Sequence, residues 1–135
     1  MPSKQTAAGA WSVHPIEHLI SAYYDITHGV GLAVLTPAWM SYVLSDTTAP
    51  RLARFAREVF GVEEADNRKA AELEIQKVRA FNQSLGMPAT LSEAGVPEDL
   101  FDEMASEAVR TSTIASRAYV KLDISDVKQI LLSCR

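Results

Sequence analysis

Apolar residues recur at the spacing of an α-helix through the middle of the chain, and this periodicity constrains the fold more than any other feature. The clearest run comprises Leu52, Phe55, Ala56, Val59 and Phe60. These side chains share one face of a helix with 3.6 residues per turn. Pro50 suits the first turn of such a helix, and Gly61 stands where the helix should end. The pattern predicts a helix that buries this face.

The second half of the chain continues the helical pattern. Residues 62–85 are predicted to form one helix with a charged outer face. Its apolar stripe comprises Ala71, Ile75, Val78, Phe81 and Leu85. A loop rich in glycine and proline follows over residues 86–95, and a further helix is predicted after it. Residues 118–124 alone would allow a strand, but Asp123 and Asp126 are typical of a helix cap, so we predict a short final helix.

The composition indicates a single globular domain. A chain of 135 residues and 14.8 kDa, with 47% apolar and 22% charged residues, can bury a sizeable core. The net charge of −4 offers no basic surplus for nucleic-acid binding. Cys134 is the only cysteine, so the chain has no internal disulfide, and a reducing compartment follows as the simplest expectation. We therefore predict a cytoplasmic protein that binds no nucleic acid.

Two segments bear on targeting and on membranes. Residues 1–10 are small and polar, lack the apolar stretch of a signal peptide, and are predicted to be flexible. Residues 26–45 carry no formal charge when His28 is neutral, and they are densely apolar only from Leu32 onward. A spanning helix needs about 20 predominantly apolar residues. The sequence therefore favours a buried core helix over a membrane span, and Pro37 removes one backbone hydrogen bond within it.

The three histidines of the chain, His14, His18 and His28, fall within one window of 15 residues. His14 and His18 are four residues apart and share one face of a helix, and His28 precedes Gly29 at the joint to the next helix. Neutral imidazole is the commonest metal ligand in proteins, yet spacing alone leaves metal binding and core packing equally open. Glu17 and Asp25 are further ligands by type, although a helix turns Glu17 about 100° away from His18. From the residues alone, the site is incomplete.

Residues 11–43 nevertheless resemble a specific signature. The sequence reads WSVHPIEHLISAYYDITHGVGLAVLTPAWMSYV, with a histidine, a second one four residues later, and a third in an HG pair fourteen residues after the first. This segment is similar to the metal-binding signature of the iron-containing alcohol dehydrogenases, in the branch of NADPH-dependent aldehyde reductases and butanol dehydrogenases. Gly86-Met87-Pro88 and residues 122–130 resemble later parts of the same family. The resemblance spans roughly residue 11 to the C-terminus.

The resemblance implies a fold and a set of site residues. The fold is an all-α bundle of about five to seven helices, similar to the C-terminal metal-binding domain of that family, with a dehydroquinate synthase-like fold. Residues 11–135 would form this domain, behind the flexible segment 1–10. His14 and His28 match the metal ligands, for iron or zinc. His18 matches a histidine near the nicotinamide and the substrate, where it would act catalytically as a proton relay, with simple orientation of its neighbours as the other reading.

The resemblance also implies partners that this sequence does not supply. The family's nucleotide-binding domain carries a glycine-rich phosphate motif and two further metal ligands, and no G-x-G-x-x-G motif occurs here. We therefore expect a C-terminal piece of an NAD(P)-dependent oxidoreductase of alcohols or aldehydes, inactive alone, that works with an N-terminal nucleotide-binding domain and forms no membrane contact. A homodimer is compatible with this reading. The alternative is a free-standing helical interaction or dimerisation module with a vestigial histidine cluster.

Overall fold

The computed structural model describes residues 13–112 and 120–135, and within them it contains α-helices, one short 3₁₀ helix and no strand. The elements are α2 (Val13–Tyr24), α3 (His28–Val43), α4 (Ala49–Phe60), α5 (Asn67–Ser84), η1 (Glu98–Leu100), α6 (Phe101–Thr111) and α7 (Ile124–Ser133). The six α-helices confirm the all-α prediction. The segment 1–10, predicted to be flexible, lies outside the described residues.

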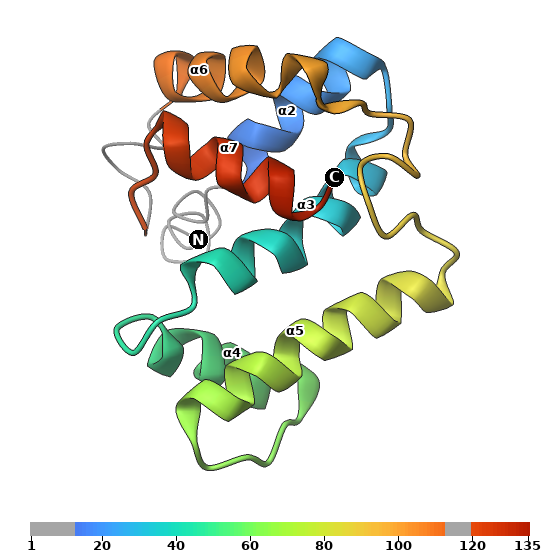
Figure 1. Cartoon of the computed structure of the whole chain (residues 1–135). Helices are drawn as coiled ribbons and strands as arrows, with labels where there is room; N and C mark the ends of the chain where they lie inside the picture. The colour runs from blue at the N-terminus through green and yellow to red at the C-terminus, as the bar shows by residue number, and fades with distance from the viewer. Residues whose placement is uncertain (1–12, 113–119) are drawn as a thin grey trace, which may run out of the picture.

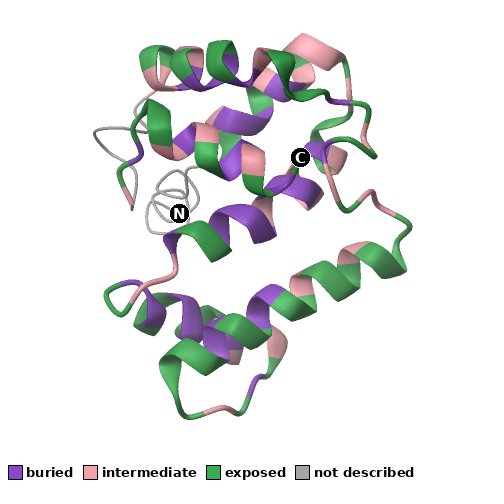
Figure 2. Cartoon of the chain, viewed as in Figure 1, coloured by how far each residue is buried: buried purple, intermediate pink, exposed green. Residues whose placement is uncertain are grey.

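The helices form two groups on either side of α3 (Figure 1). Helices α4 and α5 pack against each other on one side, and α2, α6 and α7 gather on the other. Helix α3 contacts α2, α5 and α7, so it joins the two groups. The buried residues of Figure 2 accordingly concentrate along α3 and on the facing sides of its neighbours.

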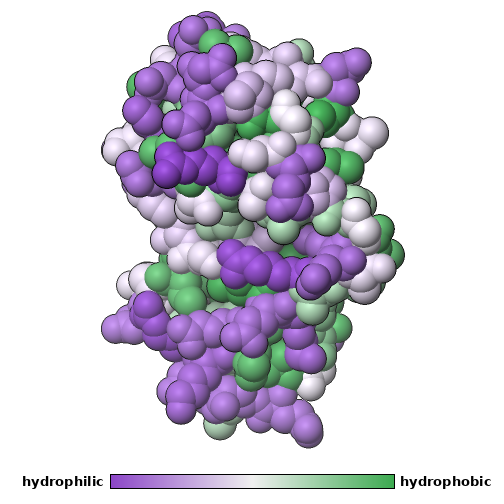
Figure 3. All heavy atoms as spheres, turned by 45° about the vertical axis from the view of Figure 1, so that its right-hand side comes forward, coloured by the Kyte–Doolittle hydropathy of each residue, from purple (hydrophilic) through white to green (hydrophobic). Residues whose placement is uncertain are grey.

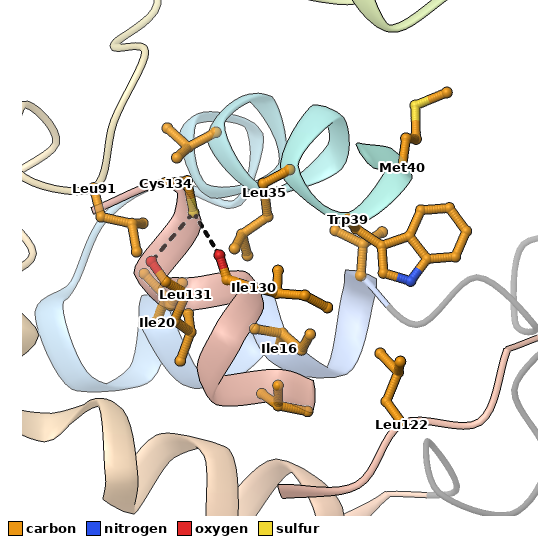
Figure 4. Close-up of a cluster of buried hydrophobic side chains, with 14 of the residues drawn as sticks. Ile16, Ile20, Leu35, Trp39, Met40, Leu91, Leu122, Ile130, Leu131 and Cys134 are labelled. Carbon is orange, nitrogen blue, oxygen red and sulfur yellow. Dashed lines mark hydrogen bonds between the residues drawn. The ribbon is translucent and has the colours of Figure 1, made fainter. Parts of the chain in front are cut away.

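Two sets of side chains fill the interior. The larger core brings together side chains of α2, α3 and α7, among them Ile16, Ile20, Leu35, Ile130 and Leu131 (Figure 4). Trp39 is fully buried in it. A smaller cluster joins α4 to α5 mainly through alanines, whose small side chains let the two helices approach closely. Cys134 is free and buried, and burial raises the pKa of its thiol to about 12.

Helix α3 is buried on several sides, as the uncharged segment 26–45 predicted. Val34, Leu35, Ala38, Trp39 and Met40 are each less than 5% exposed. None of the helices in the described part of the chain combines the length and the apolar character needed to cross a membrane. The prediction of a buried core helix is confirmed.

The proline inside α3 is compensated from outside the helix. Pro37 has no N–H, so the carbonyl of Ala33 lacks its usual helical donor. The side chain of Asn82, on α5, donates from Nδ2 to this carbonyl oxygen at 2.9 Å. The helix runs unbroken from His28 to Val43. An amide from α5 therefore replaces the missing backbone donor.

We expect Asn82→Ala to lower the free energy of unfolding by about 1–2 kcal/mol, because the part-buried carbonyl of Ala33 would lose its only side-chain donor among the described residues. The measurement is urea unfolding followed by circular dichroism. Gln83→Ala, on the neighbouring exposed position of α5, is the matched control and should leave stability nearly unchanged. Equal effects of the two substitutions would contradict this account.

Local signals set the helix ends largely as predicted. Gly61 ends α4 with a φ of 66°, in the left-handed region that glycine adopts without strain. Asp123 and Asp126 form a reciprocal capping box at the start of α7, with bonds of 2.9 Å in both directions. The preference for a final helix over a strand is thus confirmed for residues 120–135.

Two expectations for residues 62–85 were wrong. The helix starts only at Asn67, because Asp66 caps it by accepting a bond from the N–H of Lys69 at 3.1 Å. Phe81 and Leu85 are 61% and 58% exposed, although they continue the apolar stripe. Figure 1 shows the reason, since the C-terminal end of α5 extends beyond α4. The face turned forward in Figure 3 accordingly shows hydrophobic patches within a mostly hydrophilic surface.

Candidate metal centre

A tight connection between α2 and α3 sets the geometry of the histidines. Asp25 follows α2 with a φ of 54°, a left-handed conformation that aspartate tolerates better than most residues. Thr27 then caps α3, and its Oγ1 accepts from the N–H of Val30 at 3.4 Å. The second helix turns back against the first, so His28, the first residue of α3, faces the side chains of α2. Asp25 serves the turn and is absent from the histidine cluster.

All three histidines converge, as the sequence predicted. One ring nitrogen from each of His14, His18 and His28 lies within 4.8 Å of the others, and all three residues are exposed. The ring of His28 stacks on that of His14 at 5.3 Å between centroids and meets that of His18 edge-on at 5.4 Å. Burial, together with the nearby rings of His28 and His18, lowers the pKa of His14. His14 therefore favours its neutral form, whose free lone pair can bind a metal.

The sequence turned Glu17 away from the histidine face of α2, and it is indeed absent from the cluster of three histidines. Its burial between α2 and α3, which is complete, was not predicted. Its Oε1 pairs with Nδ1 of His28, and its Oε2 accepts a hydrogen bond from Ser21 Oγ at 2.5 Å. The position of Glu17 on the apolar face of α2 was the signal that could have predicted its burial. A glutamate among Val13, Ile16 and Ile20, on the apolar face of α2, needs a buried polar partner.

The donor set fits a divalent cation. Three imidazoles at an accessible surface offer nitrogen ligands of the kind that zinc and iron accept, and they leave further coordination positions open. A buried carboxylate behind one of them is the usual arrangement around metal-ligating histidines. The described residues supply no fourth ligand to this cluster. The geometry therefore suits a centre that shares its metal with ligands from elsewhere or with a substrate.

Comparisons with known proteins identify the family to which the chain belongs. The profile of the Fe-containing alcohol dehydrogenase family, C-terminal part, matches residues 4–134. NADH-dependent butanol dehydrogenase A of Clostridium acetobutylicum is 43% identical over 121 residues, which are 89% of this chain and 31% of that protein. The crystal structure of NADH-dependent butanol dehydrogenase A from Thermotoga maritima superposes with a TM-score of 0.75 at 32% identity, covering 93% of this chain and 33% of that one.

A second structure supports the fold alone. The aldehyde reductase YqhD of Escherichia coli superposes with a TM-score of 0.80 at 21% identity, over 93% of this chain and 33% of that chain. The chain thus spans about a third of the length of the relatives that it matches. The resemblance carried by residues 11–43 is confirmed: this chain belongs to the Fe-containing alcohol dehydrogenase family and corresponds to its C-terminal helical domain.

Proposed function

We propose that this chain is the metal-binding part of an NAD(P)-dependent alcohol dehydrogenase or aldehyde reductase. Residues 11–135 form the metal-binding domain, and His14 and His28 bind a divalent cation, iron or zinc. The convergence of three imidazoles at the exposed junction of α2 and α3 carries this proposal. The relatives named for butanol and aldehyde chemistry with NADH or NADPH support the substrate class and the nicotinamide cofactor.

Each histidine has a distinct task in this proposal. A divalent cation held by His14 and His28 would supply Lewis-acid polarisation of the alcohol or aldehyde oxygen. His14 and His28 provide neutral imidazole nitrogens from two different helices, so the α2–α3 turn fixes their separation. His18 lies one helical turn after His14, with a ring nitrogen within 4.8 Å of both ligands. In this proposal it would hold or move a proton beside the reacting oxygen, a task for which enzymes use histidine most often.

The nicotinamide is held by a different domain in this proposal. The sequence contains no glycine-rich phosphate-binding motif, and the relatives are about three times as long as the chain. Hydride transfer needs the dinucleotide and the substrate aligned at one site. The chain therefore contributes the metal side of a site that a nucleotide-binding domain completes.

We expect no butanol oxidation by the isolated 135 residues and clear NAD(P)-dependent oxidation by a chimera. The chimera joins roughly the first two thirds of the Clostridium acetobutylicum enzyme to this chain in place of the matching last third. The measurement is nicotinamide absorbance with butanol and added Fe²⁺ or Zn²⁺. The same chimera with His14→Ala and His28→Ala is the control and should be inactive. A folded chimera that binds nucleotide and metal but turns over no alcohol would contradict the proposed function.

A further inference from the structure

We propose that Glu17 is a positioning residue for the metal centre: its buried carboxylate holds the proton of His28 on Nδ1 and so turns the lone pair of Nε2 toward the metal. Gly31 is the position that makes room for this carboxylate. The inference rests on the proposed role of His28 as a ligand. It deepens that role by naming the groups that orient the ligand.

The two carboxylate oxygens of Glu17 are both engaged. Oε1 pairs with Nδ1 of His28, and Oε2 accepts from Ser21 Oγ at 2.5 Å. Glu17 itself is 0% exposed, so it could not stay buried as a charge without such donors. Because both oxygens are occupied and enclosed, Glu17 is unsuited to bind the metal itself. It is suited to accept the Nδ1 proton.

His28 is accordingly buried on one edge and open on the other. Its side chain is 47% exposed, while the carboxylate that it contacts is fully enclosed. A neutral imidazole carries one proton, and an acceptor at Nδ1 keeps that proton there. Nε2 is then the free donor nitrogen. Without the carboxylate, the ring could exchange tautomers and rotate, and metal affinity would fall.

The backbone of α3 at Gly31 lies directly against the carboxylate of Glu17. A Cβ at position 31 would lie 2.0 Å from Oε2 of Glu17 and 2.6 Å from its Cδ and Cγ, which is a severe clash. Gly29 lies two residues earlier in the same helix, and a Cβ there would meet nothing within 4 Å. Glycine weakens a helix interior, so its presence at 31 needs a packing reason. The side chain of Glu17 supplies that reason.

A purely structural role is the competing explanation, since Glu17 also ties α2 to α3. The double variant Glu17→Ala/Gly31→Ala separates the two roles. It removes the carboxylate and fills part of the space with the methyl group that the glycine had excluded. We expect Gly31→Ala alone to lower the unfolding midpoint, and the added Glu17→Ala to recover much of that loss. Metal affinity should not recover.

The first measurement is the tautomer of His28 in the metal-free chain, from long-range ¹H–¹⁵N correlation spectra. We expect protonated Nδ1 in the unaltered chain and a mixture of tautomers in the double variant. The conservative Glu17→Gln keeps a carbonyl acceptor and should keep most of the Nδ1 tautomer. Where the double variant does not fold, the metal affinity of Glu17→Gln decides instead, because the inference expects it to be lower than that of the unaltered chain. Identical tautomers in the unaltered chain and a folded double variant would overturn the inference.

The second measurement is the dissociation constant for Co²⁺ and Zn²⁺. We expect the double variant to bind about 10–100-fold more weakly and Glu17→Gln to lie between. Gly29→Ala is the matched glycine control and should leave the affinity unchanged. Unchanged affinity in the double variant would also overturn the inference. If the unaltered chain binds neither ion, the affinities are measured in the chimera with the nucleotide-binding domain, where absence of binding contradicts the proposed metal role, while the tautomer measurement still decides what Glu17 does to His28.

Discussion

His14→Ala and His28→Ala should each abolish metal retention and alcohol turnover. Each substitution removes one nitrogen donor from a cluster in which one ring nitrogen per histidine lies within 4.8 Å of the others. With one ligand fewer, the site would hold a cation weakly and would lose the polarisation of the substrate oxygen that the cation would supply. Metal content, by mass spectrometry, and turnover are both measured in the protein with its nucleotide-binding domain present.

His18→Ala should behave differently. We expect this variant to keep the metal and to lose about a hundredfold or more in turnover, because a positioned proton relay contributes on that order. Asp25→Asn is the control, since asparagine also tolerates the left-handed turn between α2 and α3. Loss of metal in His18→Ala with retention in His14→Ala would reverse the assignment of the ligands. Retention of metal and rate in all three variants would return the histidines to a packing role.

Glu74→Gln should raise the free energy of unfolding by about 2 kcal/mol at pH 8. At pH 5 the same substitution should change it little. Glu74 is 1% exposed on α5, and its Oε1 finds no hydrogen-bond partner among the described residues. Burial raises the pKa of this carboxyl to about 7, from an ordinary value of 4.5. The charged form is thus disfavoured in the folded protein, and glutamine removes that charge without changing the shape of the side chain.

The sign of the pH dependence follows from the two pKa values. Below about pH 4 the carboxyl is protonated in both the folded and the unfolded chain, so it contributes no pH dependence. As the pH rises from about 4.5 to 7, the unfolded chain releases the proton more readily, and the folded state loses stability. Urea unfolding at several pH values measures this loss. Glu72→Gln, at an exposed position of the same helix, should show no such trend, and a constant difference between Glu74→Gln and the unaltered chain would contradict the explanation.

Local sequence signals predicted much of the fold because they act within a few residues. Gly61 ends α4 by its own backbone conformation, and Asp123 caps α7 through a residue three positions away. Phe81 and Leu85 show that such local signals do not predict which residues are buried. Helical periodicity defines a face, but only the length and placement of neighbouring helices decide whether that face is covered.

Part of the candidate site was likewise predicted from the sequence, and part of it was not. The spacing of the histidines and the resemblance of residues 11–43 predicted that His14 and His28 would meet. Glu17 was missed because its partners, His28 and Gly31, lie on another helix and reach it only through the left-handed turn at Asp25. The angle between neighbouring residues of one helix correctly turned Glu17 away from His18. It carried no information about what the next helix would bring.

The clash at position 31 also restricts the order in which this site could have arisen by single substitutions. With alanine at 31, the glutamate side chain would have to leave its present position and its bonds to His28 and Ser21, because a Cβ would overlap its carboxylate. The buried arrangement of Glu17 therefore favours an order in which glycine stands at 31 before glutamate appears at 17. A descendant that kept the histidines but exchanged Gly31 first should pass through a less stable intermediate. The two positions are thus coupled in the order of their substitutions, whereas a Cβ at Gly29 would meet nothing within 4 Å and imposes no such order.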